Sequence, residues 1–181
     1  MKQNLKHTAK RQNKSVSPWI KYCLMGGVAL LIVAGMLYAY RYMSLDREFH
    51  YNIKTFGEET YKEIFSLEDT KDKAESVMDF AEEAFSFVGT KEEAEAQFGL
   101  LSRYSCTDPE ATSQEHTLDY IVSKIDDEGG YLWVAYASSY LDPRGESIHL
   151  TGTEDQRILS RWTVEADEEG KLTVTHVQEG P

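Results

Sequence analysis

An unbroken uncharged run is the feature that most constrains this chain. Residues 22–40 are nineteen consecutive positions without a charged side chain, and no other stretch of the sequence approaches that apolar length. A helix of this length reaches about 28 Å, close to the ~30 Å hydrocarbon thickness of a bilayer. Trp19, Lys21 and Arg41 lie at its ends, where aromatic rings and cations favour the membrane interfaces. The run therefore predicts one transmembrane helix over residues 19–42.

The charges are divided unequally around this run. Residues 1–41 contain seven Lys and Arg and no Asp or Glu, so they carry +7. The other 12 Lys and Arg and all 31 Asp and Glu follow, which gives −19. Segments rich in Lys and Arg stay on the cytoplasmic side of a span. We therefore expect a single-pass cell-membrane protein with a cytoplasmic N-terminus and an extracytoplasmic C-terminal domain.

A cleaved signal peptide is the alternative interpretation of the same run. The apolar core of a signal peptide is usually about 7 to 15 residues long and ends in a small-x-small cleavage pattern. The run here is longer, and residues 36–40 read Met-Leu-Tyr-Ala-Tyr. These differences favour an uncleaved anchor.

Composition divides the rest of the chain into three further segments. Residues 1–18 are basic and polar with little to bury, which is typical of a disordered cytoplasmic tail held near anionic lipid. Nucleic acid is not an expected partner, because the lysines of this tail are not interleaved with aromatic residues. Residues 43–68 are expected to form a stalk and a short helix, with residues 44–55 either as the stalk or as the first helical turns that leave the membrane. Residues 69–181 are expected to form one extracytoplasmic α+β domain.

Periodicity predicts helices first. A short helix is expected over about residues 57–65, and a stronger one over 69–88, where apolar residues recur at steps of three and four. The members of this stripe are Ala74, Val77, Met78, Ala81, Ala84, Phe85 and Val88. A third helix is expected from Thr90 to about Tyr104, because Thr90 and Glu93 have the spacing of a capping box.

From residue 117 onward the pattern changes to a period of two. It predicts strands over residues 118–125, 131–141, 148–151, 157–166 and 171–178. The acidic runs at 126–128 and 167–169 each precede glycine and predict hairpin turns. Helices followed by antiparallel strands indicate an α+β domain with helices on one face of a curved sheet. Trp133, Trp162 and the Phe85 stripe are its expected core.

The order of these elements resembles a known family. The terminal segment RILSRWTVEADEEGKLTVTHVQ closes the chain as a strand, a turn and a strand, after two or three helices and further strands. Over about residues 69–178 this order is similar to the cone-shaped fold of the nuclear transport factor 2-like superfamily. Behind a short basic tail and one span, such a domain is similar to the bitopic inner-membrane scaffold components of conjugative, type IV secretion-like machines. The resemblance implies a role in conjugation or secretion.

The sequence contains few signs of catalysis. No Gly-x-Ser-x-Gly, His-Glu-x-x-His, phosphate-binding loop or paired Cys-x-x-Cys occurs. The isolated polar candidates are His116, Asp119, Tyr120, His149 and His176. None forms a spaced pair or triad, and the acidic runs lack the ligand spacing of a calcium loop. We therefore expect no catalytic, cofactor-binding or metal-binding residue, and no cofactor.

Two further features bear on association between chains. Cys23 lies in the expected span and Cys106 in the expected domain, so these two thiols cannot form an internal disulfide. Gly35 and Ala39 have the small-xxx-small spacing that lets two membrane helices approach closely. This spacing favours a homo-oligomer, although small residues are also common in spans by chance.

We therefore expect a non-enzymatic structural or assembly component of an envelope complex, whose partners are membrane lipid and other envelope proteins. The alternative is a membrane-tethered enzyme or small-ligand-binding protein that uses the cavity of the cone. A sensor that reports inward is a third interpretation, but about twenty cytoplasmic residues leave no room for a signalling domain.

Overall fold

The computed structural model describes residues 18–180. The chain divides into two compact units, Met1–Met43 and Ser44–Pro181, and each is described by itself. The expected cytoplasmic tail lies outside the described residues except for its last position, Pro18, which begins the first helix.

The described part of the first unit is the N-terminal part of helix α1, which spans Pro18–Phe56. This part is long and apolar enough to cross a membrane, as its length and composition predict. Its large apolar side chains are exposed rather than buried against protein, for example Leu31 with 75% of its surface exposed. A signal sequence near the N-terminus also satisfies this criterion of length and composition.

The second unit has helices first and strands afterwards, as predicted for an α+β domain. Its helices after α1 are α2 (Glu58–Ile64), α3 (Lys71–Ser86), α4 (Lys91–Phe98) and the 3-10 helix η1 (Gly99–Tyr104). Its strands are β1 (Ser113–Ile125), β2 (Gly129–Leu141), β3 (Ser147–Thr151), β4 (Ile158–Ala166) and β5 (Leu172–Glu179). The expected helix over residues 90–104 is confirmed as α4 followed by one tighter 3-10 segment.

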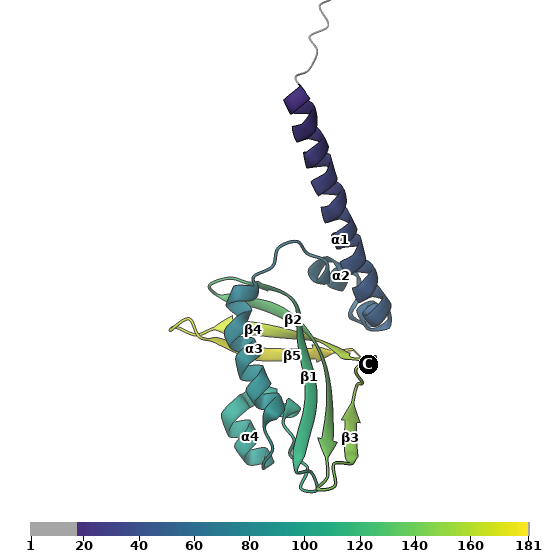
Figure 1. Cartoon of the computed structure of the whole chain (residues 1–181). Helices are drawn as coiled ribbons and strands as arrows, with labels where there is room; N and C mark the ends of the chain where they lie inside the picture. Colours follow the sequence, from purple (N-terminus) through teal and green to yellow (C-terminus); the bar gives the residue numbers. More distant parts are fainter. Residues whose placement is uncertain (1–17, 181) are drawn as a thin grey trace, which may run out of the picture. The chain divides into compact units, whose positions relative to one another are not determined.

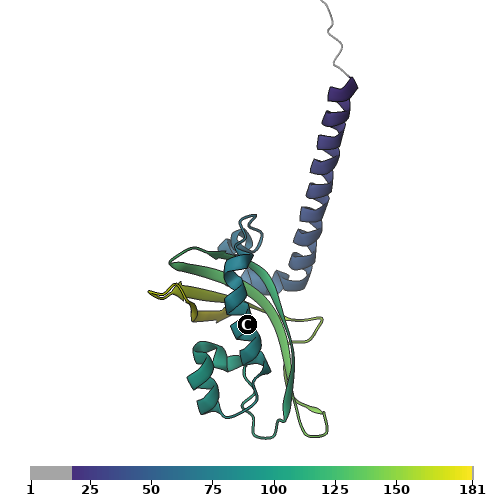
Figure 2. The ribbon, with the colours of Figure 1, turned by 60° about the vertical axis from the view of Figure 1, so that its left-hand side comes forward.

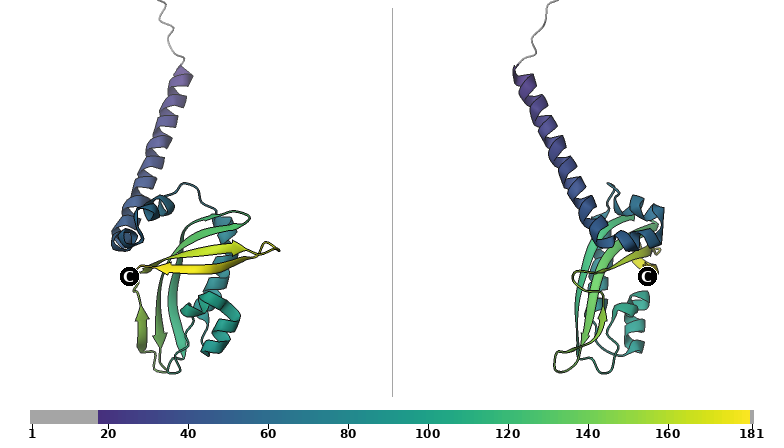
Figure 3. Two further views of the ribbon diagram at one scale, coloured as in Figure 1. Left: turned by 180° about the vertical axis from the view of Figure 1, so that it is seen from behind. Right: turned by 90° about the vertical axis from the view of Figure 1, so that its right-hand side faces the viewer.

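All five strands form one antiparallel sheet in the order β1-β2-β4-β5, and β3 also pairs with β2. The first part of β2 pairs with β4, and residues 138–141 of β2 pair with β3. Consequently β3 and β4 occupy successive parts of the same edge of β2. The sheet bends strongly, so β4 and β5 run at a steep angle to the end of β2 that carries β3 (Figure 1; Figure 3).

Local chemistry explains several boundaries. Thr90 and Glu93 form the predicted capping box: the Glu93 amide donates to the Thr90 hydroxyl and the Thr90 amide donates to the Glu93 carboxylate. The predicted turn includes Gly130, which the structure places at the start of β2 with a φ of +155°. A Cβ atom at Gly130 would lie 1.9 Å from the Lys124 carbonyl oxygen, so only glycine fits there.

The strand β2 is buried on both faces. Its residues Leu132, Val134 and Tyr136 join the larger core cluster, together with residues of α3, α4 and η1. The alternate residues Trp133 and Ala135 join a second cluster on the opposite face. Burial on both faces accounts for the nearly continuous apolar sequence of this strand. Helix α3 lies along β1 on the first face (Figure 2).

The second face is covered by the last turns of α1 and by α2. Phe49 and Ile53 of α1 are 1% and 0% exposed. These residues belong to the segment 43–68, for which the sequence suggests a stalk, yet here they pack within the unit that begins at Ser44. The sequence predicts helices on one face of the sheet only. In the structure α2 and the last turns of α1 also cover the second face.

A half-buried carboxylate fastens α2 to this second face. Glu63 of α2 accepts hydrogen bonds from the Trp133 indole nitrogen at 2.8 Å and from two guanidinium nitrogens of Arg161 at 2.8 and 3.0 Å. The guanidinium of Arg161 also lies over the Tyr131 ring, 4.9 Å from its centroid. Two-pronged Arg–carboxylate contacts of this kind fix orientation as well as adding energy.

Candidate functional site

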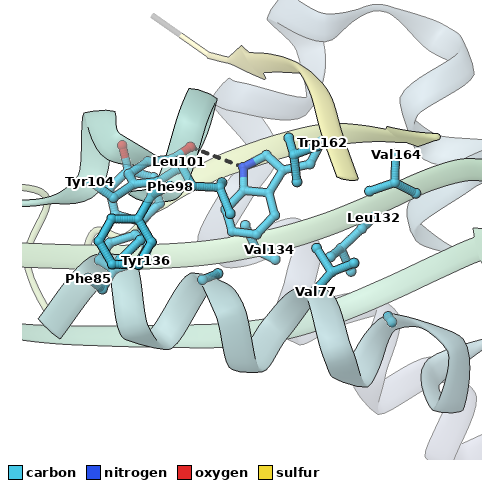
Figure 4. Packing of buried hydrophobic residues seen from close by; sticks show 14 of the residues in the cluster. Val77, Phe85, Phe98, Leu101, Tyr104, Leu132, Val134, Tyr136, Trp162 and Val164 are labelled. Carbon is cyan, nitrogen blue, oxygen red and sulfur yellow. Dashed lines mark hydrogen bonds between the residues drawn. The ribbon is translucent and has the colours of Figure 1, made fainter. Parts of the chain in front are cut away.

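The space between α3 and the sheet is filled with aromatic rings (Figure 4). Phe85 of α3 stacks on Tyr104 of η1 with centroids 4.6 Å apart. Tyr136 of β2 and Trp162 of β4 contact the same Tyr104 ring at 5.0 and 5.6 Å. Trp133 and Trp162 are both fully buried, so the prediction that they form the core is confirmed. Packed rings from α3, η1, β2 and β4 therefore occupy this region.

The polar atoms of these rings form a connected network. The Trp162 indole nitrogen donates to the Tyr104 hydroxyl at 3.0 Å and to the Ser160 hydroxyl at 2.9 Å. The hydroxyls of Tyr104 and Tyr136 both donate to the Glu179 carboxylate, at 2.8 and 2.9 Å. Burial, and next the charge of Glu179, raise the pKa of both tyrosines well above the usual value. Both hydroxyls therefore remain neutral donors.

His116 is half-buried and connects β1 to α3. Its Nε2 lies 2.8 Å from a carboxylate oxygen of Glu82. Its ring packs against Phe85, with centroids 5.4 Å apart. The observed role of His116 is thus to join a strand to the helix that covers it.

Asp119 and Tyr120 point to different partners. Asp119 forms an ion pair with Arg157, and Arg157 also binds Glu48 of α1 at 2.6 Å. The bond from Arg157 to Glu48 is the main cause that raises the pKa of the guanidinium. Tyr120 donates its hydroxyl to Asp69, and burial is the main reason that its pKa rises to about 12.

His149 and His176 lie on exposed positions of β3 and β5. His149 is 3.2 Å from the Thr151 hydroxyl and packs against the Tyr140 ring. Among the interactions of the described residues, none joins His116, Asp119, His149 or His176 to another of these four. Nor do the described residues include a group of three or more His, Cys, Asp or Glu placed to hold a metal ion.

Cys106 is buried, and its backbone forms an isolated bridge to Val88. Burial raises the pKa of the Cys106 thiol, which makes it a poor nucleophile. Cys23 lies exposed on α1 in the other compact unit. Both thiols are free.

No protein-family model, curated protein or solved structure matches this chain. Its function must therefore be inferred from its own residues.

The surface of the second unit includes an open trough of about 580 Å³ beside the paired ends of β1, β2 and β3, and we call it the acidic trough. Glu115 and Glu154 line it, together with hydroxyl side chains and the exposed Leu150, and its lining contains no Lys or Arg. A shallow surface of this kind offers contacts to another macromolecule rather than enclosure of a substrate.

A second hollow, which we call the apolar notch, has a volume of about 220 Å³. It lies between α3, the α4–η1 junction and the first residues of β5. Its lining residues are Val77, Phe80, Gln97, Phe98, Gly99, Leu100, Leu101 and 171–174. Phe80 and Leu100 remain 39% and 50% exposed at this site. Large apolar side chains grouped at the surface in this way are typical of contact sites between proteins.

Sequence reasoning did not find the apolar notch or Glu179. Phe80 lies within the helix predicted over 69–88 and is not a member of the predicted stripe. It is three residues after Val77 and four before Ala84, so it borders that stripe, and this spacing is the signal in the sequence. Glu179 is one of many carboxylates, and only the tertiary fold brings it to Tyr104 and Tyr136.

Proposed function

We propose that this protein is a membrane-anchored structural or assembly component of an envelope complex, which acts through protein–protein contacts of the unit Ser44–Pro181. One observation carries the proposal: the space between α3 and the sheet is filled by Phe85, Tyr104, Tyr136 and Trp162. The polar candidates support the same function, because His116 and Asp119 each join two elements of the fold.

The proposal extends to the fold family and to the type of complex. Helices packed on a strongly bent antiparallel sheet support a nuclear transport factor 2-like cone. The short basic tail, the apolar helix and one domain support a component of a conjugative transfer or secretion machine. The charge difference of +7 against −19 supports a cytoplasmic N-terminus and an extracytoplasmic domain. The proposed partners are membrane lipid, other envelope proteins and further copies of this chain.

Alanine substitutions separate this function from catalysis. We expect His116→Ala, Asp119→Ala, His149→Ala and His176→Ala to leave the protein folded and able to restore function in a strain that lacks its gene. Exposed side chains and single surface ion pairs contribute about 0 to 1 kcal/mol each to stability. Circular dichroism, membrane localisation and complementation of the deletion are measured in parallel.

A core substitution provides the control. Trp162→Ala should lower the free energy of unfolding by about 3 to 5 kcal/mol and abolish complementation through loss of folded protein. The opposite pattern would refute the proposal: a correctly localised and folded variant at His116, Asp119, His149 or His176 that has the full deletion phenotype. Such a variant would indicate an enzyme or a ligand-binding protein.

A further inference from the structure

The apolar notch has the size of a site for one side chain. Small-molecule sites usually enclose about 300 to 1,000 Å³. The volume of about 220 Å³ is smaller, and most of the lining residues are apolar, among them Val77, Phe80, Phe98, Leu101 and Leu172. A single large apolar side chain from a protein fits these walls better than a cofactor does.

The charge beside the notch limits what can enter it. Lys171 is the one charged residue among those that line it. Asp167, Glu168 and Glu169 precede Lys171 in the same turn, but none of these three residues lines the notch. No ion pair involves the Lys171 side chain among the described residues. The complementary occupant therefore has an apolar side chain next to a carboxylate.

The chain itself exposes such a pair. Leu67 has 86% of its surface exposed, which is the largest value among the exposed large apolar residues of the described chain. It lies in the connection between α2 and α3 and is followed by Glu68. This connection is held in place, because the Glu68 carboxylate is 2.7 Å from Lys124 and the Thr70 amide donates to the Ser123 carbonyl at 3.1 Å. Leu67 is thus presented on a fixed loop without a packing role of its own.

We propose that Leu67 of one copy of this chain docks in the apolar notch of a second copy, with Glu68 beside Lys171. The inference rests on the proposed assembly function and names one of its partners. The two contact sites are different surfaces of the same domain, because Leu67 precedes α3 while the notch lies along α3 and β5. In a pair of copies joined this way, one notch and one Leu67 remain unoccupied. Further copies can therefore add through the same contact and form a ring or a row.

Cross-linking of the full-length chain in membranes tests the contact. Two copies with different tags are expressed together, both with Cys23→Ser; one carries Leu67→Cys and the other Leu100→Cys. A short bismaleimide should give a product that contains both tags. The matched control replaces Leu100→Cys by Leu150→Cys, which is similarly exposed at 58% but lies on β3. The control pair should give at least several-fold less product, and equal product from both pairs would overturn the proposal.

A charge exchange tests the specific pairing. Lys171→Glu in the Leu100→Cys copy should lower the yield several-fold, and so should Glu68→Lys in the Leu67→Cys copy. Glu68→Lys also removes the Glu68–Lys124 ion pair, so its effect alone does not identify the partner of Glu68. Glu68→Lys in one copy is therefore combined with Lys171→Glu in the other. The combination should restore most of the yield. Two losses that simply add would refute the contact between Glu68 and Lys171.

The two proposals fail in different ways. Absence of the mixed-tag product, with complementation intact in the His116, Asp119, His149 and His176 variants, would overturn the docking of Leu67 and retain the assembly function. Loss of complementation in a folded variant of one of those four residues would overturn the assembly function, whatever the cross-linking yield.

Discussion

Glu179 shows how a single residue can organise a core that sequence patterns describe only as apolar. Its carboxylate, near the end of the described chain, accepts from Tyr104 and Tyr136 and forms an ion pair with Arg103 at 3.0 Å. It thereby ties β5 to η1 and to β2. The burial of the aromatic residues was predictable, since Trp133 and Trp162 lie at apolar positions of predicted strands. Apart from Ser160, which is two residues from Trp162, the partners of their polar atoms were not predictable, because they lie far away in the sequence.

The tyrosines predict a loss of stability in alkali. Tyr120 has a pKa raised to about 12 in the folded chain, chiefly by burial, above the ordinary tyrosine value of 10.0. The folded state therefore holds this proton more tightly than the unfolded state does. Its contribution to stability is complete below pH 10 and is lost as the pH rises toward 12. Tyr104 and Tyr136, whose pKa values are also raised, act in the same direction.

Urea unfolding at about pH 8 and about pH 11 measures this loss. The midpoint should fall between the two conditions, and it should fall less in Tyr120→Phe, which lacks the ionising hydroxyl. Tyr38→Phe, in the other compact unit, is the matched control and should leave the dependence unchanged. A pH dependence identical in Tyr120→Phe and in the unsubstituted chain would contradict the assignment to Tyr120.

At the level of elements, the last turns of α1 form part of the domain. Leu45, Phe49, Ile53 and Phe56 recur at steps of four and three, and all four belong to or pack against the second core cluster. In the sequence this stripe is a signal for a packed helix. Because it directly follows the apolar run, the segment is interpreted from the sequence as a stalk that leaves the membrane. Strand β1 likewise begins at Ser113, before the alternating pattern starts at Leu118, because its polar first residues pair with the end of β2. Such extensions follow from pairing and cannot be seen in one segment alone.

Two phenylalanines test the contribution of this layer. Phe49→Ala removes a side chain that is 1% exposed and should lower the free energy of unfolding by about 3 to 5 kcal/mol. Phe80→Ala is the matched control and should have a clearly smaller effect, because Phe80 is 39% exposed. Denaturant unfolding of the fragment Ser44–Pro181, followed by tryptophan fluorescence, compares the two. Equal effects would indicate that the α1 turns are not part of the stable fold.

At the scale of the whole molecule, the order of the elements and their α+β class could be predicted from hydrophobic periods and turn residues. The two surface hollows could not, because each combines residues from three separate segments. The orientation of the chain is a prediction from charge alone. The six Lys and Arg that precede the apolar run are expected to stay in the cytoplasm, and this sets the predicted orientation.

A reporter fused after Pro181 measures this orientation. Alkaline phosphatase at that position should be active, because it folds only outside the cytoplasm, whereas a fluorescent protein that matures only in the cytoplasm should remain dark. The same two reporters fused before Met1 should give the reverse result. Activity of the cytoplasmic reporter after Pro181, or a mature chain that begins after Tyr40, would contradict the single-pass orientation.

The position of β2 has a consequence for how the domain comes apart. One strand supplies Leu132, Val134 and Tyr136 to one cluster and Trp133 and Ala135 to the other, and it also pairs with β1, β3 and β4. Departure of β2 would remove packing partners from both layers at once. We therefore expect the two layers to unfold in one cooperative transition, and substitutions on opposite faces of β2 to be energetically coupled through the strand between them.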